Sequence, residues 1–228
     1  MKLNVRSLLF DFGGTIDTNG VHWGEVIRQS YLKNQINIPN EQFREVYQSV
    51  ERLLGSQPLI SPDDTFRDVL RLKIKLQFEQ LGLRDSSLAL KIAADCYDRA
   101  FEQTCRSSKI LLELSRRYPI YLVSNFYGNL QTVLQEFRIN GLFREVIESA
   151  NVGCRKPGLD IFRIAIEKAA CKPEEVVIIG DSYKNDIQPA IELGCPSIWL
   201  KVKSWHDDDE SVEHPLIIKD ISELLTIL

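Results

Sequence analysis

The chain has 228 residues, of which 44% are hydrophobic and 26% charged, with a formal net charge of −4 and a pI of about 5.5. These values are ordinary for a globular protein, and without a basic run or a long apolar run we expect neither a nucleic-acid partner nor a membrane partner. The five cysteines are scattered and form no Cys-x-x-Cys pair, which argues against a disulfide framework or a zinc site and favours a cytoplasmic location.

The first element in the chain is an apolar run over residues 7–10, which ends in Asp11. A short apolar run closed by a turn signal is typical of a buried strand in a parallel sheet. Asp11 is then expected at the carboxyl end of the strand, where open α/β sheets bind ligands. Gly13 and Gly14 follow and allow the backbone to turn sharply and to approach a bound group closely.

From residue 18 to about residue 105 the pattern predicts helices only. The expected helices cover residues 22–34, then 41–54 with Asn40 as N-cap and Gly55 as stop, then a third helix from a Ser61 cap to Gly82, and a fourth from residue 86 to about residue 105. Because no strand pattern interrupts this segment, we interpret it as a separate helical insert.

After residue 107 strands and helices alternate. Strands are predicted at 120–123, 146–148, 176–179 and 197–200, with an edge strand at 216–218; helices are predicted near 107–117, 129–138, 159–170 and 185–193. Alternation of this kind predicts a parallel sheet with right-handed crossovers. The acidic run at 206–210 is interpreted as a solvated loop.

Complementary polar groups fall at or just after the ends of these predicted strands. Asp11 follows the first strand, Ser124 the second, and Asp181 the strand at 176–179, with Asp186 five residues further on. Converging carboxylates repel one another unless a cation lies between them, and an all-oxygen set suits Mg²⁺. Lys156, in a loop before a helix, is suited to neutralise phosphate charge.

At these positions the sequence resembles the haloacid dehalogenase superfamily. The four motifs that carry the resemblance are Asp11-Phe12-Gly13-Gly14-Thr15, Ser124-Asn125, Lys156-Pro157 and Gly180-Asp181-Ser182-Tyr183-Lys184-Asn185-Asp186. The resemblance implies an α/β fold with a Rossmann-like core, strand order 5-4-1-2-3, and an inserted α-helical C1 cap. On this basis the core comprises residues 1–17 and 106–228, and the cap comprises residues 18–105.

The resemblance also implies a magnesium site and a nucleophile. Asp11 is expected to be the nucleophile and a Mg²⁺ ligand, and the backbone carbonyl of Gly13 is expected to be a second ligand. Asp181 is the expected third ligand, with Asp186 as a further ligand or its neighbour.

The remaining roles concern the substrate, which the resemblance implies is a small phosphorylated molecule. Ser124 and Lys156 are expected to bind the phosphoryl group and to act in catalysis, and Asn125 and Gly14 to contribute to substrate binding. Thr15 is expected to orient the nucleophile loop. Substrate identity and oligomeric state stay open.

Position 13 departs from the pattern, because phosphatases of this family carry a second Asp there as general acid and base. Gly13 cannot supply that function. Dehalogenase and phosphonatase functions are disfavoured, since Asp181 and Asp186 preserve a metal-type motif and the helix at 41–54 contains no lysine. Two functions remain: a Mg²⁺-dependent phosphatase with a dispensable or substituted acid/base, for which His22 is a candidate, and a phospho-ligand-binding or regulatory protein with poor turnover.

Overall fold

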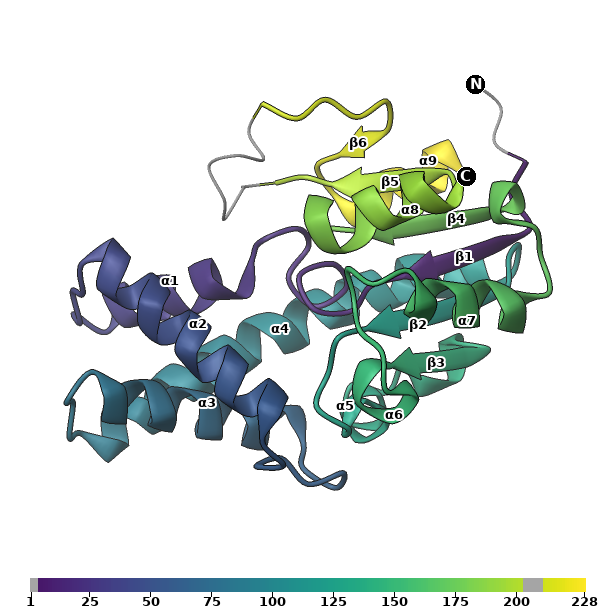
Figure 1. The fold of residues 1–228 in the computed structure, drawn as a ribbon. Helices are drawn as coiled ribbons and strands as arrows, with labels where there is room; N and C mark the ends of the chain where they lie inside the picture. The colour runs from purple at the N-terminus through teal and green to yellow at the C-terminus, as the bar shows by residue number, and fades with distance from the viewer. Residues whose placement is uncertain (1–3, 203–210) are drawn as a thin grey trace.

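The computed structural model describes residues 4–202 and 211–228, so the acidic run at 206–210 lies outside the described residues (Figure 1). Six strands form one parallel sheet in the order β3-β2-β1-β4-β5-β6. The strands are β1 (Ser7–Phe10), β2 (Ile120–Ser124), β3 (Glu145–Glu148), β4 (Val176–Gly180), β5 (Ser197–Leu200) and β6 (Ile217–Ile218). The predicted order of the first five strands is confirmed, and the short edge strand β6 extends the sheet beyond β5.

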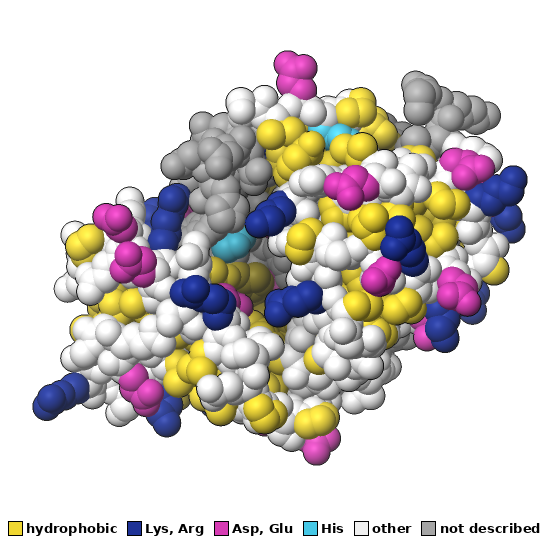
Figure 2. All heavy atoms as spheres, in the orientation of Figure 1, with side chains coloured by type: hydrophobic (Ala, Val, Ile, Leu, Met, Phe, Trp, Pro, Cys, Tyr) yellow, Lys and Arg dark blue, Asp and Glu magenta, His cyan; other side chains and the backbone are white. Residues whose placement is uncertain are grey.

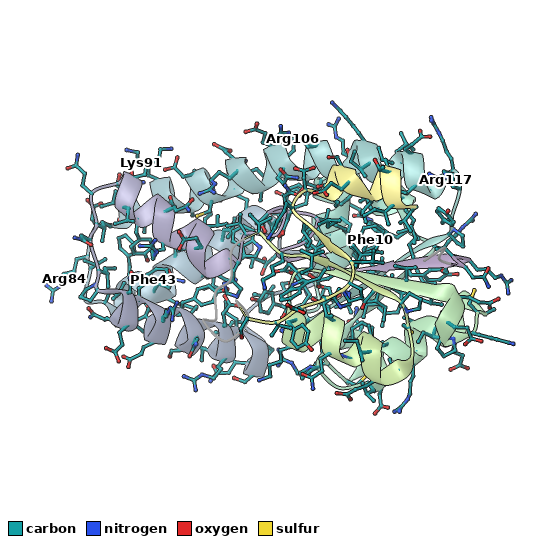
Figure 3. The ribbon with its side chains drawn as sticks, turned by 90° about the horizontal axis from the view of Figure 1, so that it is seen from above. Phe10, Phe43, Arg84, Lys91, Arg106 and Arg117 are labelled. Carbon is teal, nitrogen blue, oxygen red and sulfur yellow. The ribbon has the colours of Figure 1, made fainter. Side chains whose placement is uncertain are left out.

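The central strand β1 is buried on both faces, which explains its unbroken apolar sequence. Leu8 and Phe10 pack on the side of α4 (Ser86–Ser115), α5 (Leu130–Glu136) and α9 (Leu224–Ile227). Leu9 packs on the opposite side, against α7 (Asp160–Ala169) and α8 (Gln188–Leu193). Seen from above, the sheet lies between these two helical layers, with Phe10 near its middle (Figure 3). The short helix α6 (Ser149–Val152) follows β3.

A second set of helices lies beyond the carboxyl ends of the strands, toward which the arrowheads point (Figure 1). This helical group consists of α1 (Trp23–Lys33), α2 (Asn40–Ser56), α3 (Phe66–Gln80) and the first half of α4. Its interior is rich in aromatic contacts, such as that of Tyr31 with Phe43 and Phe78. The prediction of helices only in this segment is confirmed.

Two predicted helix ends in this group are wrong. The third helix begins at Phe66 rather than near Ser61, because Thr65 and Asp68 form a reciprocal capping box there. The Ser61 backbone N–H instead donates to the Asp64 carboxylate at 2.7 Å within a preceding turn. Gly55 does not end α2, which continues to Ser56. A single glycine in a helix is tolerated when neighbouring side chains keep the helix packed.

The helices predicted at 86–105 and 107–117 are one helix, α4, of 30 residues and about 45 Å. Figure 3 shows it running from Lys91 in the helical group past Arg106 and alongside the sheet. The buried stripe continues across the expected break through Thr104 and Ser107, which are polar and therefore invisible to an apolar periodicity. Across the described part of the chain, no helix is both long and apolar enough to cross a bilayer.

Ser107 ties α4 to the loop that follows β1. Its hydroxyl donates to the Ile16 carbonyl oxygen at 2.7 Å and accepts from the Gln103 side chain at 3.1 Å. Ser107 and Ile16 are fully buried, and Gln103 is half-buried beside them. The loop carrying Asp11 is therefore fastened to the helix that reaches into the helical group.

Ser107→Ala is expected to lower the free energy of unfolding by about 1–2 kcal/mol, because the buried Ile16 carbonyl oxygen loses this donor. Ser108→Ala is the matched control, since the Ser108 hydroxyl is exposed and bonds only within its own helix. Its effect is expected within about 0.5 kcal/mol. Urea unfolding of both variants measures the difference, and equal losses would contradict the assignment.

Candidate active site

Three carboxylates meet at the carboxyl ends of the two central strands. Asp11 follows β1 and Asp181 follows β4, which pairs directly with β1. Asp186 lies in a π-helical turn, Tyr183–Ile187, that folds back over the end of β4. One carboxylate oxygen from each of the three residues lies within 4.8 Å of the others. The sequence-based expectation that these carboxylates converge agrees with this geometry.

Lys156 lies between two of these carboxylates. Its Nζ is 2.5 Å from Oδ1 of Asp11 and 2.6 Å from Oδ1 of Asp186, and the residue is only 4% exposed. Burial alone would lower the pKa of Lys156, but Asp11 and Asp186 outweigh it and raise the pKa. The lysine therefore stays charged and offsets part of the repulsion between the two carboxylates.

The backbone of Lys156 is held by Asn125. The Asn125 Oδ1 accepts from the Lys156 N–H, and its Nδ2 donates to the Lys156 carbonyl oxygen, both at 2.9 Å. Asn125 therefore positions the lysine loop, while also lining the cavity described below. Ser124 precedes Asn125 in the sequence, and its side chain is buried at the carboxyl end of β2.

Burial has the largest effect on the pKa values in this cluster, and repulsion between its carboxylates adds to it. Burial, followed by Asp11 and Asp186, raises the pKa of Asp181 well above its ordinary value. Burial raises the pKa of Asp186 to about 6, although Lys156 counteracts this. With all groups charged, three carboxylates and one ammonium leave a formal charge of −2. An all-oxygen set with this residual charge fits a divalent cation such as Mg²⁺.

Hydrogen bonds from neighbouring elements fix the carboxylates. The Thr15 hydroxyl lies 3.2 Å from both Asp11 Oδ2 and Asp181 Oδ1, so it bridges the two strands' ends. The Trp199 indole N–H on β5 donates to the Asp181 carbonyl oxygen at 2.8 Å. The Ser182 N–H donates to Asp186 Oδ2 at 3.1 Å. Thr15 thus orients two of the carboxylates, the Ser182 N–H orients the third, and Trp199 fixes the backbone of Asp181.

The two glycines after Asp11 have different surroundings. Gly14 has φ +98°, and a Cβ atom there would lie 2.4 Å from a carboxylate oxygen of Asp181. Gly13 lies outside the left-handed region, and a Cβ atom there would meet only the Trp23 indole, at 3.9 Å. Gly14 is therefore required for the Asp181 approach, whereas Gly13 leaves space for a side chain.

A cavity of about 160 Å³ opens between the sheet end and the helical group. Figure 2 shows a hollow between these two parts, with basic side chains near its rim. Gly13, Gly14 and Asp181 line one end, and aromatic side chains line the walls. The aromatic lining residues are Trp23, Tyr47, Phe66, Phe126 and Tyr127.

A buried polar cluster forms the other end of this cavity. Lys73, 6% exposed, lies 2.6 Å from Glu51 Oε1, and its Nζ donates to the Tyr127 hydroxyl at 3.2 Å. The Tyr127 hydroxyl in turn donates to Glu51 Oε2 at 2.7 Å. Burial would lower the pKa of Lys73, but Glu51 and Tyr47 outweigh it and raise the pKa. This end of the cavity is thus polar but carries no net charge.

A wider cavity of about 680 Å³ adjoins the first one. Glu51, Asn125, Phe126 and Tyr127 line both cavities. The wider one also carries Arg52 and Arg155. It therefore offers a cationic approach to the smaller cavity.

Sequence reasoning missed Asp17, which is 1% exposed and lines the smaller cavity. Its Oδ1 accepts from the Gly14 N–H at 2.7 Å, and its Oδ2 accepts from the Trp23 indole N–H at 2.8 Å. Burial raises the pKa of Asp17 to about 7 against these hydrogen bonds. In the sequence Asp17 looks like one residue of a polar connection, and only its burial singles it out.

Sequence reasoning also missed the Lys73–Glu51–Tyr127 cluster. Lys73 is one of several basic residues of the predicted helices that are candidate anion contacts, and helical periodicity does not show which of them faces the core. The candidate His22 lies at the cavity, where its Nδ1 accepts from the Gly24 N–H at 3.0 Å as the N-cap of α1. The arrangement as a whole offers a carboxylate nucleophile, a lysine beside it, acidic groups for a cation and an organic pocket.

A family model for haloacid dehalogenase-like hydrolases matches residues 8–200 of the chain. Glyceraldehyde 3-phosphate phosphatase of Methanothermobacter thermautotrophicus is 31% identical over 128 residues, covering 54% of this chain and 57% of that protein. The chain thus spans little more than half the length of this relative. Haloacid dehalogenase-like hydrolase domain-containing protein 3 of Mus musculus is 28% identical, covering 90% of this chain and 78% of that protein.

Solved structures show the same fold. The HAD-hydrolase YfnB of Bacillus subtilis, in a crystal form bound to magnesium, has a TM-score of 0.58 and 18% identity. The match covers 98% of each chain. At this identity the likeness concerns the fold alone.

Gly14→Ala and Gly13→Ala form a matched pair. Gly14→Ala is expected to destabilise the protein by more than about 1 kcal/mol, because it combines a left-handed φ with a clash against the Asp181 carboxylate. Gly13→Ala is expected to change stability by less than about 0.5 kcal/mol. Thermal or urea unfolding compares them, and similar losses in both would contradict this account of the loop.

Proposed function

The chain belongs to the haloacid dehalogenase-like hydrolases, and we propose that it is a Mg²⁺-dependent phosphatase of small phosphate monoesters. The observation that carries the proposal is the cluster of Asp11, Asp181 and Asp186, in which the ammonium of Lys156 pairs with Asp11 and Asp186. The Asp11 carboxylate can act as a nucleophile, and the Lys156 ammonium lies beside it. A phosphoryl group carries negative charge that this ammonium can neutralise, so the pair suits attack on phosphorus rather than on carbon.

The reaction then proceeds in two steps at Asp11. Its carboxylate attacks phosphorus, the bond to the ester oxygen breaks, and an aspartyl-phosphate forms while an alcohol leaves. Water next attacks this phosphorus, so that phosphate leaves and the Asp11 carboxylate is restored. Lys156 and the Ser124 region counter the phosphoryl charge. Mg²⁺, held by Asp11, Asp181, the Gly13 carbonyl and Asp186, would add further charge neutralisation.

The alternative of a phospho-ligand-binding protein with poor turnover rested on the missing side chain at position 13. It is less favoured, because the nucleophile, the lysine and the acidic pair are all in one place, as turnover needs. The relative from Methanothermobacter thermautotrophicus is named as a phosphatase, which supports the same choice.

We assign the organic part of the substrate to the cavity end formed by Lys73, Glu51 and Tyr127. This end offers hydrogen-bond donors and acceptors but no net charge, and the cavity holds about 160 Å³. A small neutral group with hydroxyls matches it better than a second anionic group, since Lys73 is already paired with Glu51. Residues 18–105 act in this proposal as the cap that closes over the substrate and excludes water.

The cellular setting follows from the thiols. All five cysteines are free, at positions 96, 105, 154, 171 and 195, which favours a reducing compartment such as the cytoplasm. The expected partner is the phosphorylated small molecule itself.

Asp181→Asn tests the metal assignment. In EDTA at pH 8 the variant is expected to melt at a higher temperature than the parent, because one buried repulsive charge is removed. Mg²⁺ is expected to raise the melting temperature of the parent but not of the variant, and Mg²⁺-dependent phosphate release is expected to fall at least about a hundredfold. Asp160→Asn, an exposed acidic residue on α7, is the control. Full parental activity in excess EDTA would contradict the metal assignment.

Glu51→Gln tests the substrate end of the cavity. The change leaves the Lys73 ammonium without its carboxylate partner. A phosphate ester that itself carries a carboxylate can then take the place of Glu51 beside Lys73. We expect kcat/KM for 2-phosphoglycolate, relative to that for glycerol 1-phosphate, to rise about tenfold, the size of one charge-assisted hydrogen bond. Glu45→Gln, exposed on the same helix, is the control and should leave the ratio unchanged. An unaltered ratio in a folded Glu51→Gln protein would remove this cluster from the substrate site.

A further inference from the structure

The space left by Gly13 is adjacent to a carboxylate from elsewhere in the loop. A Cβ atom at position 13 would lie 3.9 Å from the Trp23 Nε1. The same indole N–H donates to Asp17 Oδ2 at 2.8 Å. Gly13, Asp17 and Asp181 also line one and the same cavity. A side chain from position 13 and the side chain of Asp17 would therefore meet at the same indole nitrogen.

We propose that Asp17 is the general acid and base of this enzyme, in place of the side chain that position 13 lacks. The inference rests on the proposed phosphatase function. In the first step the Asp17 carboxyl gives its proton to the ester oxygen as the bond from that oxygen to phosphorus breaks. In the second step the Asp17 carboxylate takes a proton from the water that attacks the phosphorus of the aspartyl-phosphate. The hydroxyl group that remains of the water becomes part of the phosphate product. Asp17 ends protonated, as it began.

The hydrogen bonds to Asp17 leave capacity for this proton. Each carboxylate oxygen accepts one N–H, from Gly14 and from Trp23, and each has a second lone pair. These two donors also fix the carboxylate in place, as a proton-transfer group requires. Neither donor is itself titratable, so the proton is not shared with them.

The surroundings suit an acid that works near neutral pH. Burial raises the pKa of Asp17 to about 7, and the charge of Asp11 adds to this rise. Asp181, His22, Glu51 and Lys73 line the same cavity. On its other side Asp17 borders a cavity lined by Arg99, Glu102 and Arg106. An acid with a pKa near the working pH is both available as a donor and competent as a base.

His22 is the competing candidate, and its geometry is less favourable. Its Nδ1 accepts the Gly24 N–H at the start of α1, and its ring packs against Tyr47 of α2. These contacts of the His22 side chain are thus with α1 and α2 of the helical group. Asp17 instead belongs to the loop that carries the nucleophile and bonds directly to the glycine turn.

A general acid also broadens the expected substrates. Alkyl phosphates have poor leaving groups and need a proton donor in the first step, whereas aryl phosphates need one much less. With Asp17 in this role, the enzyme hydrolyses ordinary alkyl esters and does not depend on an anomeric or acyl phosphate. The contrast between alkyl and aryl leaving groups supplies the test.

The test compares the parent with Asp17→Asn on glycerol 1-phosphate and on 4-nitrophenyl phosphate. We expect kcat/KM for the alkyl ester to fall by about 10²–10⁴-fold and that for the aryl ester to fall by less than about tenfold. The aryl ester should also give a burst of nitrophenol, because water attack on the aspartyl-phosphate has lost its base. Equal losses on both substrates without a burst would show a merely structural role and overturn the proposal, as would unchanged alkyl turnover.

The double variant Gly13→Asp with Asp17→Asn tests the same idea by rescue. The new carboxylate lies beside the same indole N–H, so alkyl turnover should recover at least about tenfold over Asp17→Asn alone. No recovery in a folded double variant would count against Asp17 as the acid and base. Asp95→Asn, which removes a carboxylate bonded to Lys33 on the helical group, is the control. His22→Gln should retain the alkyl-to-aryl ratio of the parent; loss of that ratio would transfer the role to His22.

Trp23→Phe keeps the proposal testable even where Asp17→Asn folds poorly. Loss of the indole donor raises the pKa of Asp17, so the rising limb of the pH profile for aspartyl-phosphate hydrolysis should move to higher pH. An unshifted limb would overturn the proposal.

Failure of the parent to release phosphate from any ester with Mg²⁺ would instead overturn the phosphatase function and this inference together. An active parent together with the parental alkyl-to-aryl ratio in Asp17→Asn would overturn the inference alone.

Discussion

Repulsion among three clustered carboxylates, of which those of Asp11 and Asp186 are buried, is the constraint around which the site is built. Lys156 balances only part of their charge, and burial keeps water from screening the remainder. The surrounding backbone holds them together nevertheless. Adjacent pairing of β1 and β4 brings Asp11 and Asp181 to one point, and a Cβ atom at Gly180 would lie 2.4 Å from the Asp186 carboxyl carbon. The fold thus holds an unfavourable concentration of negative charge, which a divalent cation can relieve.

The cavity above this cluster has two ends of different electrostatic character. Asp17 and Asp181 line the sheet end, while the helical end holds a charge-balanced pair, Lys73 and Glu51. A phosphate ester is itself asymmetric, with a dianionic end and an organic end. In the proposed function these two ends of the cavity receive the two ends of the ester, and aromatic walls lie between them.

Much of the fold and of the charged cluster could be predicted from sequence, because the signals are local. Asp11 and Asp181 end apolar runs, and the alternation of strands and helices fixes a parallel sheet. The errors arise where tertiary packing decides. The break expected in α4 is absent because Thr104 and Ser107 are buried, and α3 begins late because Thr65 and Asp68 cap it. Asp17 is a further case, since its significance lies in its burial and in the distant Trp23 donor.

The unbroken helix α4 constrains how the two parts of the molecule can move. A helical group joined to the sheet by two flexible loops could rotate away from it freely. Here one of the two connections is the continuous helix α4, which begins among α1–α3 and ends alongside the sheet. Any wide separation would have to break backbone hydrogen bonds within that helix or tilt it as a lever on the sheet. Small rotations of the helical group against the sheet therefore require the least energy. Substrate and product can enter and leave through the wider cavity lined by Arg52 and Arg155 without a wide separation of the two parts.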